Sequence, residues 1–361
     1  MNTSPTRRAW RVAWLGSVMI ANFGGCTAFG LQTMRQQQAD YGAAVADGGK
    51  RQTLLNTVRL RYGYVPAFLS ANQILAGYSL QGTFSAGSQL LTGGNLRLAD
   101  HTNVGVGGTF TNNPTVTYAL VIGADFARTF LAPLQPADLF GLALGIISPE
   151  LVFGLTLHSI GPYANEGALS GEQVAADRGF AEFLKLLLEL QRAGRLAVQL
   201  DVAGRDRVAT LRLGPGETAD APERRLRCLL DLPADRTSFE VVYTLGPAKP
   251  GQIAIRTRSL IEVLGQLAGD IDVPSDDVAQ GRTYAGLPRD SVAARMSHLV
   301  VQHGALEPRA AYAAVNYDGD WFWIANDDLA TKRVFSFVML LLSLSESSRP
   351  GQPPVISIPA G

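Results

Sequence analysis

The chain has 361 residues, of which 47% are hydrophobic and 17% are charged, a composition typical of a folded globular protein and not of a disordered one. Lys and Arg together number 31, as do Asp and Glu, so the chain lacks the positive excess that neutralises many phosphates. We therefore expect no nucleic-acid partner and no strongly basic membrane-binding patch.

The N-terminus carries the most informative pattern. Arg7, Arg8 and Arg11 precede an uncharged run, Val12 to Gly25, that ends at Cys26. A charged start, a short apolar run and small residues before a cleavage point are typical of a secretory signal peptide. The run has 14 residues, which as a helix rise about 21 Å, less than the roughly 30 Å of a hydrocarbon core. We predict a signal peptide over 1–25, with an ordinary buried helix as the alternative.

Gly24, Gly25 and Cys26 resemble the lipobox of bacterial lipoproteins, although Phe23 stands where that motif usually has Leu. The resemblance implies that Cys26 becomes diacylglyceryl-modified and N-acylated, and three acyl chains anchor a protein to a membrane more firmly than one. Thr27 stands where the usual inner-membrane retention signal has Asp. This implies an outer-membrane location in a Gram-negative cell, with residues 26–50 as lipid anchor and tether.

Lipidation of Cys26 would leave Cys228 as the remaining cysteine, which excludes an intramolecular disulfide in the mature chain. Cys228 alternates with Leu226 and Leu230. This pattern predicts a buried cysteine in a strand, in preference to a reactive thiol.

The mature region begins with a predicted amphipathic helix. Leu54, Val58 and Tyr62 form one apolar stripe, and Gly63 and Pro66 end the helix. From about 68 to 121, abundant Gly, Ser, Thr and Asn predict short strands and turns. Prolines between 133 and 158 punctuate an apolar segment that predicts one or two short helices.

The next predicted helix spans about 171–193. Ser170 and Gln173 have the spacing of a capping box, and Gly194 can close the helix. Its apolar face is predicted to contain Phe180, Leu184, Leu187 and Leu188.

Alternating residues between 196 and 256 then predict antiparallel strands with one solvated face. Ser259 and Glu262 again have capping-box spacing, and a helix is predicted after them. Asp318 and Gly319 predict a two-residue hairpin turn. We expect Asn326 or Asp327 to cap the following helix, and residues 353–360 to add a final strand.

These elements predict an α+β fold, with mainly antiparallel sheets packed against several helices. The globular region is expected over 51–361, with two subdomains that could meet near 160–195.

The sequence predicts neither a catalytic site, a metal site nor a cofactor. His298 and His303 are five residues apart in a predicted strand, so their side chains would point to opposite faces. The acidic run Asp270, Asp272, Asp276 and Asp277 could suggest calcium, but it lacks the EF-hand glycine and contains Pro274, so a solvated loop is favoured. Gly105, Gly107 and Gly108 lack the lysine and the following helix of a phosphate-binding loop.

Two polar and aromatic segments are candidates for a protein interaction. The first contains Arg59, Arg61 and Tyr62, and the second contains Trp321, Trp323, Lys332 and Arg333. Together with the lipobox, these segments are similar to an uncharacterised group of proteobacterial lipoproteins, a resemblance that covers most of the mature chain and implies no activity. The alternative is a buried hairpin packed on its helix, with Arg and Lys stems covering the core.

We therefore expect a non-enzymatic lipoprotein, anchored to the membrane by its lipid, that docks or helps to assemble an envelope protein partner. A periplasmic ligand-binding protein is the first alternative and would have a large pocket lined by aromatic and polar groups between subdomains. A hydrolase acting on envelope material is the second and would bring Ser, His and Asp, or paired carboxylates, into one cleft.

Overall fold

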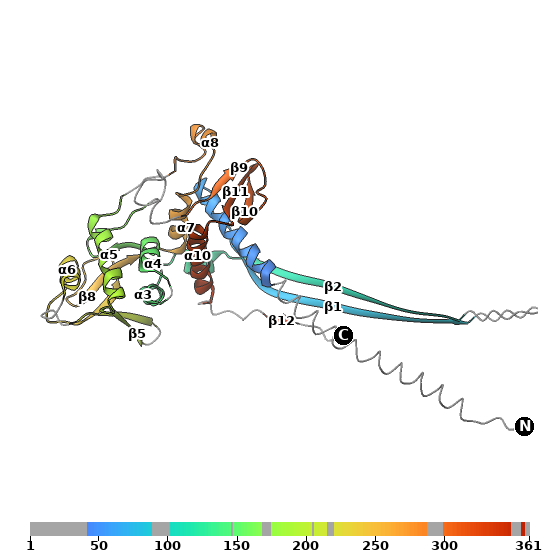
Figure 1. Ribbon diagram of the computed structural model, residues 1–361, viewed down its shortest axis with the longest axis horizontal. Helices are drawn as coiled ribbons and strands as arrows, with labels where there is room; N and C mark the ends of the chain where they lie inside the picture. The colour runs from blue at the N-terminus through green and yellow to red at the C-terminus, as the bar shows by residue number, and fades with distance from the viewer. Residues whose placement is uncertain are drawn as a thin grey trace, which may run out of the picture. The chain divides into compact units, whose positions relative to one another are not determined.

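The fold is described from a computed structural model, and the element labels of Figure 1 are used from here on. The structure describes residues 42–88, 102–145, 147–167, 175–203, 206–214, 220–286, 299–347 and 355–357. The chain forms two compact units, each assembled from separate stretches of sequence. Of the described residues, unit 1 contains 42–63, 265–286 and 299–339, and unit 2 contains the others.

Helices and sheets occur together, which confirms the predicted α+β class. Strand pairing is mainly antiparallel, as the alternating sequence pattern predicted. Among the described elements, no helix has both the length and the apolar composition to cross a membrane.

Unit 1 combines a helix over 42–61 with a three-stranded antiparallel sheet in the order β10-β11-β9. The strands are β9 (Gln302–Gly304), β10 (Ala311–Tyr317) and β11 (Asp320–Ala325), and α8 spans Ser275–Ala279. The predicted stripe of the first helix is confirmed, because Leu54, Val58 and Tyr62 are all buried. This helix is already formed at residue 42, so residues 42–50 of the predicted tether are helical.

Two helices contain residues assigned to both units, and both begin with a side-chain cap. Before α7 (Leu260–Ala268), the backbone N–H of Ser259 donates to the Glu262 carboxylate at 2.7 Å, and the Glu262 N–H donates to the Ser259 hydroxyl at 3.4 Å, so the capping box is confirmed. For α10 (Leu329–Ser347), the prediction of Asn326 or Asp327 as cap is wrong. The Asp328 carboxylate accepts from the Thr331 N–H at 3.0 Å, because the chain turns into the helix one residue later.

Unit 2 contains a six-stranded sheet in the order β4-β3-β8-β7-β6-β5. Its strands are β3 (Leu157–Ile160), β4 (Tyr163–Ala164), β5 (Ala197–Ala203), β6 (Asp206–Arg212), β7 (Ser238–Tyr243) and β8 (Gln252–Thr257). All neighbours are antiparallel except β7 and β8, which run parallel, so the prediction of antiparallel strands is wrong for this pair.

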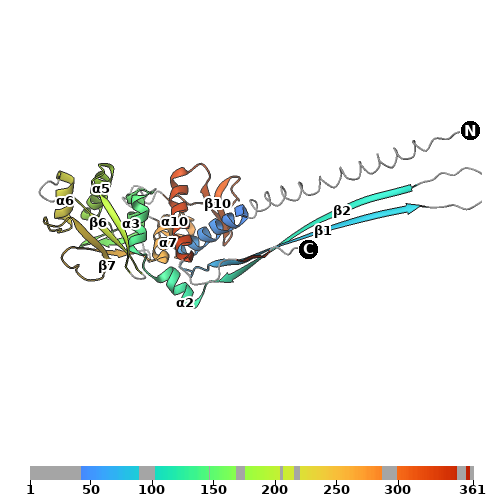
Figure 2. The same cartoon turned by 90° about the horizontal axis from the view of Figure 1, so that it is seen from below.

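The helices of unit 2 include α2 (Gly123–Phe126), the π-helical turn η1 (Ala127–Leu131), α3 (Pro136–Leu144) and α4 (Pro149–Thr156). The helix α3 packs on β5, β6 and β7, where Figure 2 shows it beside the sheet. Further along the chain are α5 (Arg178–Arg192) and α6 (Ala221–Leu229). The prediction of one or two short helices between 133 and 158 is confirmed, with two present as α3 and α4.

The helix α5 begins later than predicted, at Arg178, and the proposed cap residues Ser170 and Gln173 lie outside the described residues. Its predicted apolar face is confirmed for Phe180, Leu184 and Leu187, whereas Leu188 is half-buried. Gly194 closes the helix with a φ of 65°, a left-handed conformation that glycine adopts readily.

Cys228 lies in α6 and is exposed, so the prediction of a buried strand cysteine is wrong. The Asp220 carboxylate caps this helix by accepting from the Glu223 N–H at 3.0 Å. Leu226 and Leu230 are four residues apart, a spacing that fits one face of a helix as well as it fits alternation in a strand.

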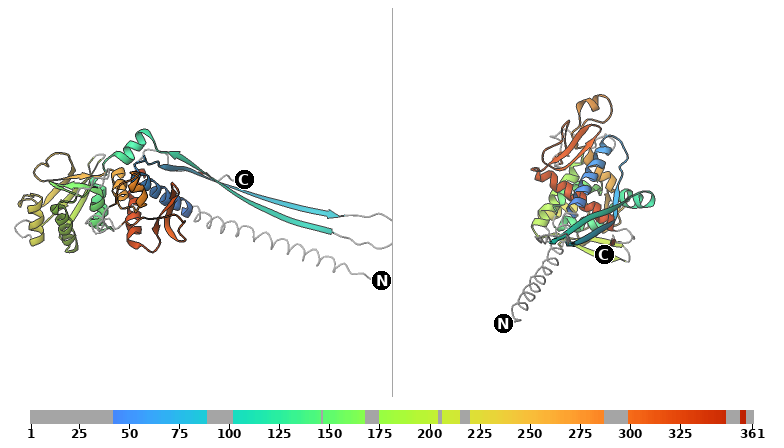
Figure 3. Two further views of the ribbon diagram at one scale, coloured as in Figure 1. Left: turned by 90° about the horizontal axis from the view of Figure 1, so that it is seen from above. Right: turned by 90° about the vertical axis from the view of Figure 1, so that its right-hand side faces the viewer.

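The segment predicted as short strands and turns forms one long antiparallel hairpin. Its strands are β1 (Leu69–Ser88) and β2 (Thr102–Leu120), which run side by side in Figures 1 and 3. The predicted C-terminal strand is β12 (Val355–Ser357), which pairs in parallel with β1 over Gln73–Leu75. Glycine, serine and asparagine favour turns, but cross-strand pairing holds them in extended backbone here.

Candidate interaction site

The β10–β11 hairpin of unit 1 carries the second of the two segments that the sequence singles out. Asp318 and Gly319 connect the strands with φ angles of 53° and 95°, which confirms the predicted two-residue turn. Positive φ at both positions is the geometry of a type I′ turn, whose twist matches that of the flanking strands. This turn fixes the register in which Trp321 lies opposite Asn316 and Trp323 lies opposite Ala314.

The two faces of β11 have different surroundings. Phe322 and Ile324 are 0% exposed and form part of the unit 1 core. Trp321 and Trp323 point to the opposite face and are half-buried. On that face β9 places Gly304 opposite Trp321 and Gln302 opposite Trp323. The tryptophans therefore lie on an accessible sheet face, whereas the residues between them hold the sheet to the core.

Gly304 leaves space for the six-membered ring of the Trp323 indole. A Cβ atom built at Gly304 would lie 3.2 Å from Cη2 of Trp323, so the indole extends across β9 at this position. Amphipathic aromatic side chains with one accessible face are enriched at protein interfaces.

The first segment is placed differently, because Arg61 is 0% exposed and Tyr62 is 9% exposed. Burial of these two side chains prevents them from contributing to an exposed contact surface. Arg59 is half-buried and donates from Nη1 to Oδ1 of Asn56 at 3.4 Å. The seven candidate residues therefore do not form one surface.

Arg61 is held by a loop that the sequence does not connect to it. Its Nη2 donates to the backbone oxygen of Tyr284 at 2.8 Å, and its guanidinium carbon lies 3.9 Å from the centre of the Tyr284 ring. The Thr283 hydroxyl donates to the Arg61 backbone oxygen at 2.7 Å. Among the described residues, Nε and Nη1 of Arg61 have no hydrogen-bond partner. Arg61 therefore fixes the 283–284 loop against the first helix.

Tyr62 begins a polar chain that reaches the hairpin turn. Its hydroxyl donates to Oδ2 of Asp277 at 2.6 Å, and Nη1 of Arg282 lies 3.0 Å from Oδ1 of the same carboxylate. Arg282 also pairs with Asp318 in the turn. Burial, with the hydrogen bond to Asp277, raises the pKa of Tyr62 above its ordinary value. These contacts connect three stretches of unit 1 and have a structural role.

Two lysines approach the ring of Tyr312 in unit 1. Nζ of Lys50 lies 4.7 Å from the ring centre and Nζ of Lys332 lies 5.9 Å from it. Lys332 also donates to the backbone oxygen of Asn326 at 2.6 Å. Arg333 is exposed on the same helix. Lys332 is thus engaged within the unit, whereas Arg333 is accessible to a partner.

The acidic run singled out as a calcium alternative is distributed among other contacts. Asp277 binds Tyr62 and Arg282, and Oδ2 of Asp272 lies 3.4 Å from Nδ1 of His303. In the part of the chain that the structure describes, no three His, Cys, Asp or Glu side chains are grouped to hold a metal ion. His101 and His298 lie outside the described residues, as does Cys26.

Unit 2 contains a buried polar cluster around Arg258. Its guanidinium donates to the backbone oxygens of Leu155 at 2.9 Å and Gly154 at 3.3 Å, and also to that of Glu166. Burial lowers the pKa of Arg258 to about 10 and raises the pKa of the Glu166 carboxyl. Because its donors bind carbonyl groups at the end of α4, Arg258 acts as a cap of that helix.

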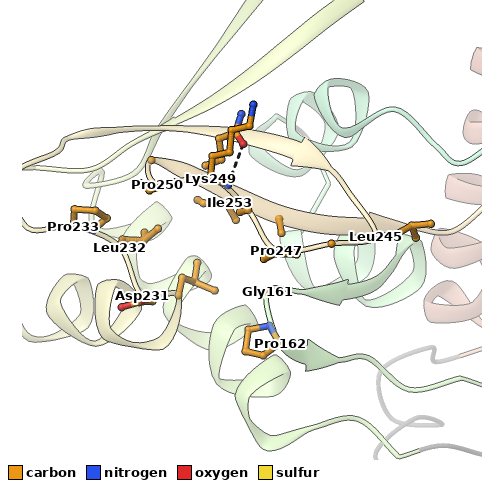
Figure 4. Close-up of a pocket in the computed structure, with 16 residues that line it drawn as sticks. Gly161, Pro162, Asp231, Leu232, Pro233, Leu245, Pro247, Lys249, Pro250 and Ile253 are labelled. Carbon is orange, nitrogen blue, oxygen red and sulfur yellow. Dashed lines mark hydrogen bonds between the residues drawn. The ribbon is translucent and has the colours of Figure 1, made fainter.

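A pocket of about 770 Å³ lies in unit 2 and is drawn in Figure 4. It is lined by residues 161–162, 230–233 and 245–254. Because β7 and β8 are parallel, the chain between them, residues 244–251, has to run back along the sheet, and this return segment forms one wall. Asp231 and Lys249 bring charge to a lining that otherwise consists of glycine, proline, aliphatic residues and Gln252.

This lining contains no serine, histidine or aromatic residue. It therefore lacks the groups that would mark the pocket as a nucleophilic site or as an aromatic ligand cage. The sequence does not predict this pocket, because its walls come together through the parallel pairing of β7 and β8.

Comparison of the chain with protein-family models, with curated proteins and with solved structures gives no match. Two separate features suit an interaction: the tryptophan face of β11 in unit 1, and the long β1–β2 hairpin in unit 2.

Proposed function

We propose that this chain is an envelope lipoprotein that is exported by a signal peptide over 1–25, carries lipid on Cys26 and resides at the outer membrane. The observation that carries the proposal is the uncharged run Val12–Gly25, which follows three arginines and ends in Gly24, Gly25 and Cys26. Three acyl chains on one residue would hold the folded units to the membrane without a spanning segment.

An interaction or assembly role is the second part of the proposal. The hairpin of β1 and β2 supports this role, because its 20- and 19-residue strands far exceed the usual length of about 5–6 residues. The accessible tryptophans of β11 also support it, since aromatic residues contribute disproportionately to interface energies. The proposed partner is another protein of the envelope.

The two alternative functions have weaker support. A ligand-binding protein would be favoured by aromatic and polar groups converging on a pocket, and the pocket of unit 2 has a lining dominated by glycine, proline and aliphatic residues. A hydrolase would be favoured by a nucleophile and base in one cleft, and the lining contains no such pair.

The anchor is tested by separating membrane from soluble fractions of cells that produce wild-type protein, Cys26→Ala or Cys228→Ala. Cys228 is exposed on α6 and serves as the matched control, because its substitution removes a thiol without touching the proposed lipid site. We expect Cys26→Ala alone to be released from membranes. Retention of Cys26→Ala at the wild-type level would contradict the proposal.

A further inference from the structure

The hairpin of unit 2 has long edges with which no described strand other than β12 pairs. Its sheet has the order β12-β1-β2, so β2 (Thr102–Leu120) has a neighbour on one side, and no other described strand pairs with its outer edge. On the opposite edge of the hairpin, β12 pairs with Gln73–Leu75 of β1. The stretch Ala76–Ser88 of β1 continues beyond that contact.

An uncovered strand edge presents backbone N–H and C=O groups to any strand of suitable length. Proteins usually block such edges with short strands, charged residues or proline. The sequences of β1 and β2 contain no Lys, Arg, Asp or Glu, and their one proline, Pro114, is paired with Ala76 near the base. From Thr102 to Asn113 the edge of β2 therefore lacks the protection that a long exposed strand normally has.

A two-stranded hairpin is also marginally stable alone in water and gains stability from a third strand. The strand β12 supplies that support at the base, where it covers three residues of β1. Beyond the base, the paired stretches Ala76–Ser88 and Thr102–Pro114 support each other alone among the described strands. The hairpin would thus gain stability from further pairing, and its backbone groups are available for it.

We propose that the outer edge of β2 pairs with the free stretch of β1 from a second copy of this chain, forming a continuous antiparallel sheet across copies. Within one copy, β1 and β2 run in opposite directions. When copies with the same orientation stand side by side, β1 of the second copy therefore runs antiparallel to β2 of the first. The strand β12 blocks the base of β1 and thereby restricts the joint to the part beyond Leu75. Such a head-to-tail contact uses a different edge on each side and can add more than two copies.

This inference rests on the proposed assembly role and deepens it. The lipid anchor is not required for the pairing, although a shared membrane surface would bring copies together. A second copy is the chosen occupant because the stretches Ala76–Ser88 and Thr102–Pro114 match in length and run in opposite directions. A strand of a foreign protein is the rival occupant and is an outcome of the test.

The first experiment measures the mass of the purified, detergent-solubilised full-length chain by sedimentation and compares it with a shortened hairpin. In the shortened variant, Asn-Gly replaces residues 78–112, so that Gly77 and Asn113, which are paired in the structure, flank a two-residue turn. The β12 contact at residues 73–75 is retained. Tyr243→Phe, at an exposed position of unit 2 outside the hairpin, is the control.

We expect the full chain and Tyr243→Phe to sediment as oligomers and the shortened variant as a monomer with an unchanged melting transition for the folded units. Monomers in every case, or oligomers of equal size in every case, would overturn the proposal. Recovery of a stoichiometric foreign protein on the hairpin would overturn the choice of a second copy.

The second experiment identifies the edges by disulfide scanning in a Cys228→Ser background. One tagged population carries a single cysteine in β1, beginning with Ser79→Cys, and another carries one in β2, beginning with Thr109→Cys, so that a disulfide between the two can form only between copies. Cross-links require Cα atoms about 4.4–6.8 Å apart and will appear in one register. Disulfides that join β1 of one copy to β2 of another support the arrangement. Disulfides that join only the β2 strands of two copies overturn it.

Repeating the sedimentation with Cys26→Ala separates the two proposals. Oligomers formed without the anchor would preserve the inference even if the lipid proposal failed. Loss of lipid labelling, measured separately, reports on the anchor alone.

Discussion

The hydroxyl of Tyr62 donates a 2.6 Å hydrogen bond to the carboxylate of Asp277, across 215 residues of sequence. This bond joins the end of the first helix to α8, and the Tyr62 ring also lies 5.1 Å from that of Tyr317 at the end of β10. Unit 1 is built from separate stretches of the chain, and these contacts are among those that hold the stretches together.

Tyr62→Phe should lower the free energy of unfolding of unit 1 by about 1–3 kcal/mol, because it removes a buried hydrogen bond to a charged group while keeping the ring. The measurement is denaturant unfolding followed by tryptophan fluorescence, since Trp321 and Trp323 lie in the same unit. Tyr243→Phe is the control, because Tyr243 is 42% exposed. Equal stability of both variants would show that the Tyr62 bond contributes nothing.

Glu166→Gln should change how stability depends on pH. Burial raises the pKa of Glu166 above its ordinary value of 4.5, so the folded chain holds this proton more tightly than the unfolded chain. The stabilising contribution is complete below pH 4.5 and is lost as pH rises through the folded pKa. The stability of Glu166→Gln relative to wild type should therefore be greater at pH 8 than at pH 4.

The check is thermal unfolding at both pH values, with exposed Glu150→Gln as the matched control. If the difference in melting temperature between wild type and Glu166→Gln is the same at both pH values, this interpretation of Glu166 is contradicted.

Asp328→Ala should destabilise the start of α10 by about 0.5–2 kcal/mol, because it removes the side chain that accepts from the Thr331 N–H. Asp327→Ala, one residue earlier, should have little effect. Thermal unfolding of the two variants compares them directly. The reverse order of effects would indicate that the cap is Asp327, one of the two residues that the sequence predicts.

Phe322→Ala and Trp323→Ala should separate the two faces of β11. Phe322 is 0% exposed, so its truncation should cost about 3–5 kcal/mol of stability. Trp323 lies on the accessible face, and its truncation should cost less. Urea unfolding measures both, and a larger loss for Trp323→Ala would show that the tryptophan face is core.

Local signals in the sequence predicted local structure well. The capping box of Ser259 and Glu262 and the turn at Asp318 and Gly319 depend on residues close together in the chain, and both are present. The stripe of Leu54 and Val58 follows from helical periodicity and is buried as predicted.

The sequence was a poorer guide wherever distant segments decide the outcome. The parallel pairing of β7 with β8, and with it the pocket, depends on how the chain between them returns. The prediction of a strand at Cys228 is wrong because the spacing of Leu226 and Leu230 fits a strand or a helix equally. Likewise, nothing near Arg61 in the sequence indicates its contact with Tyr284, so the sequence does not predict that this arginine is buried.

The central claim is the lipid on Cys26, and mass spectrometry of the N-terminal peptide of the membrane-extracted protein tests it most directly. We predict a peptide that begins at Cys26 and carries a diacylglyceryl group and an amide-linked acyl chain. A peptide in which Cys26 is unmodified, or in which residues 1–25 remain attached, would contradict the account.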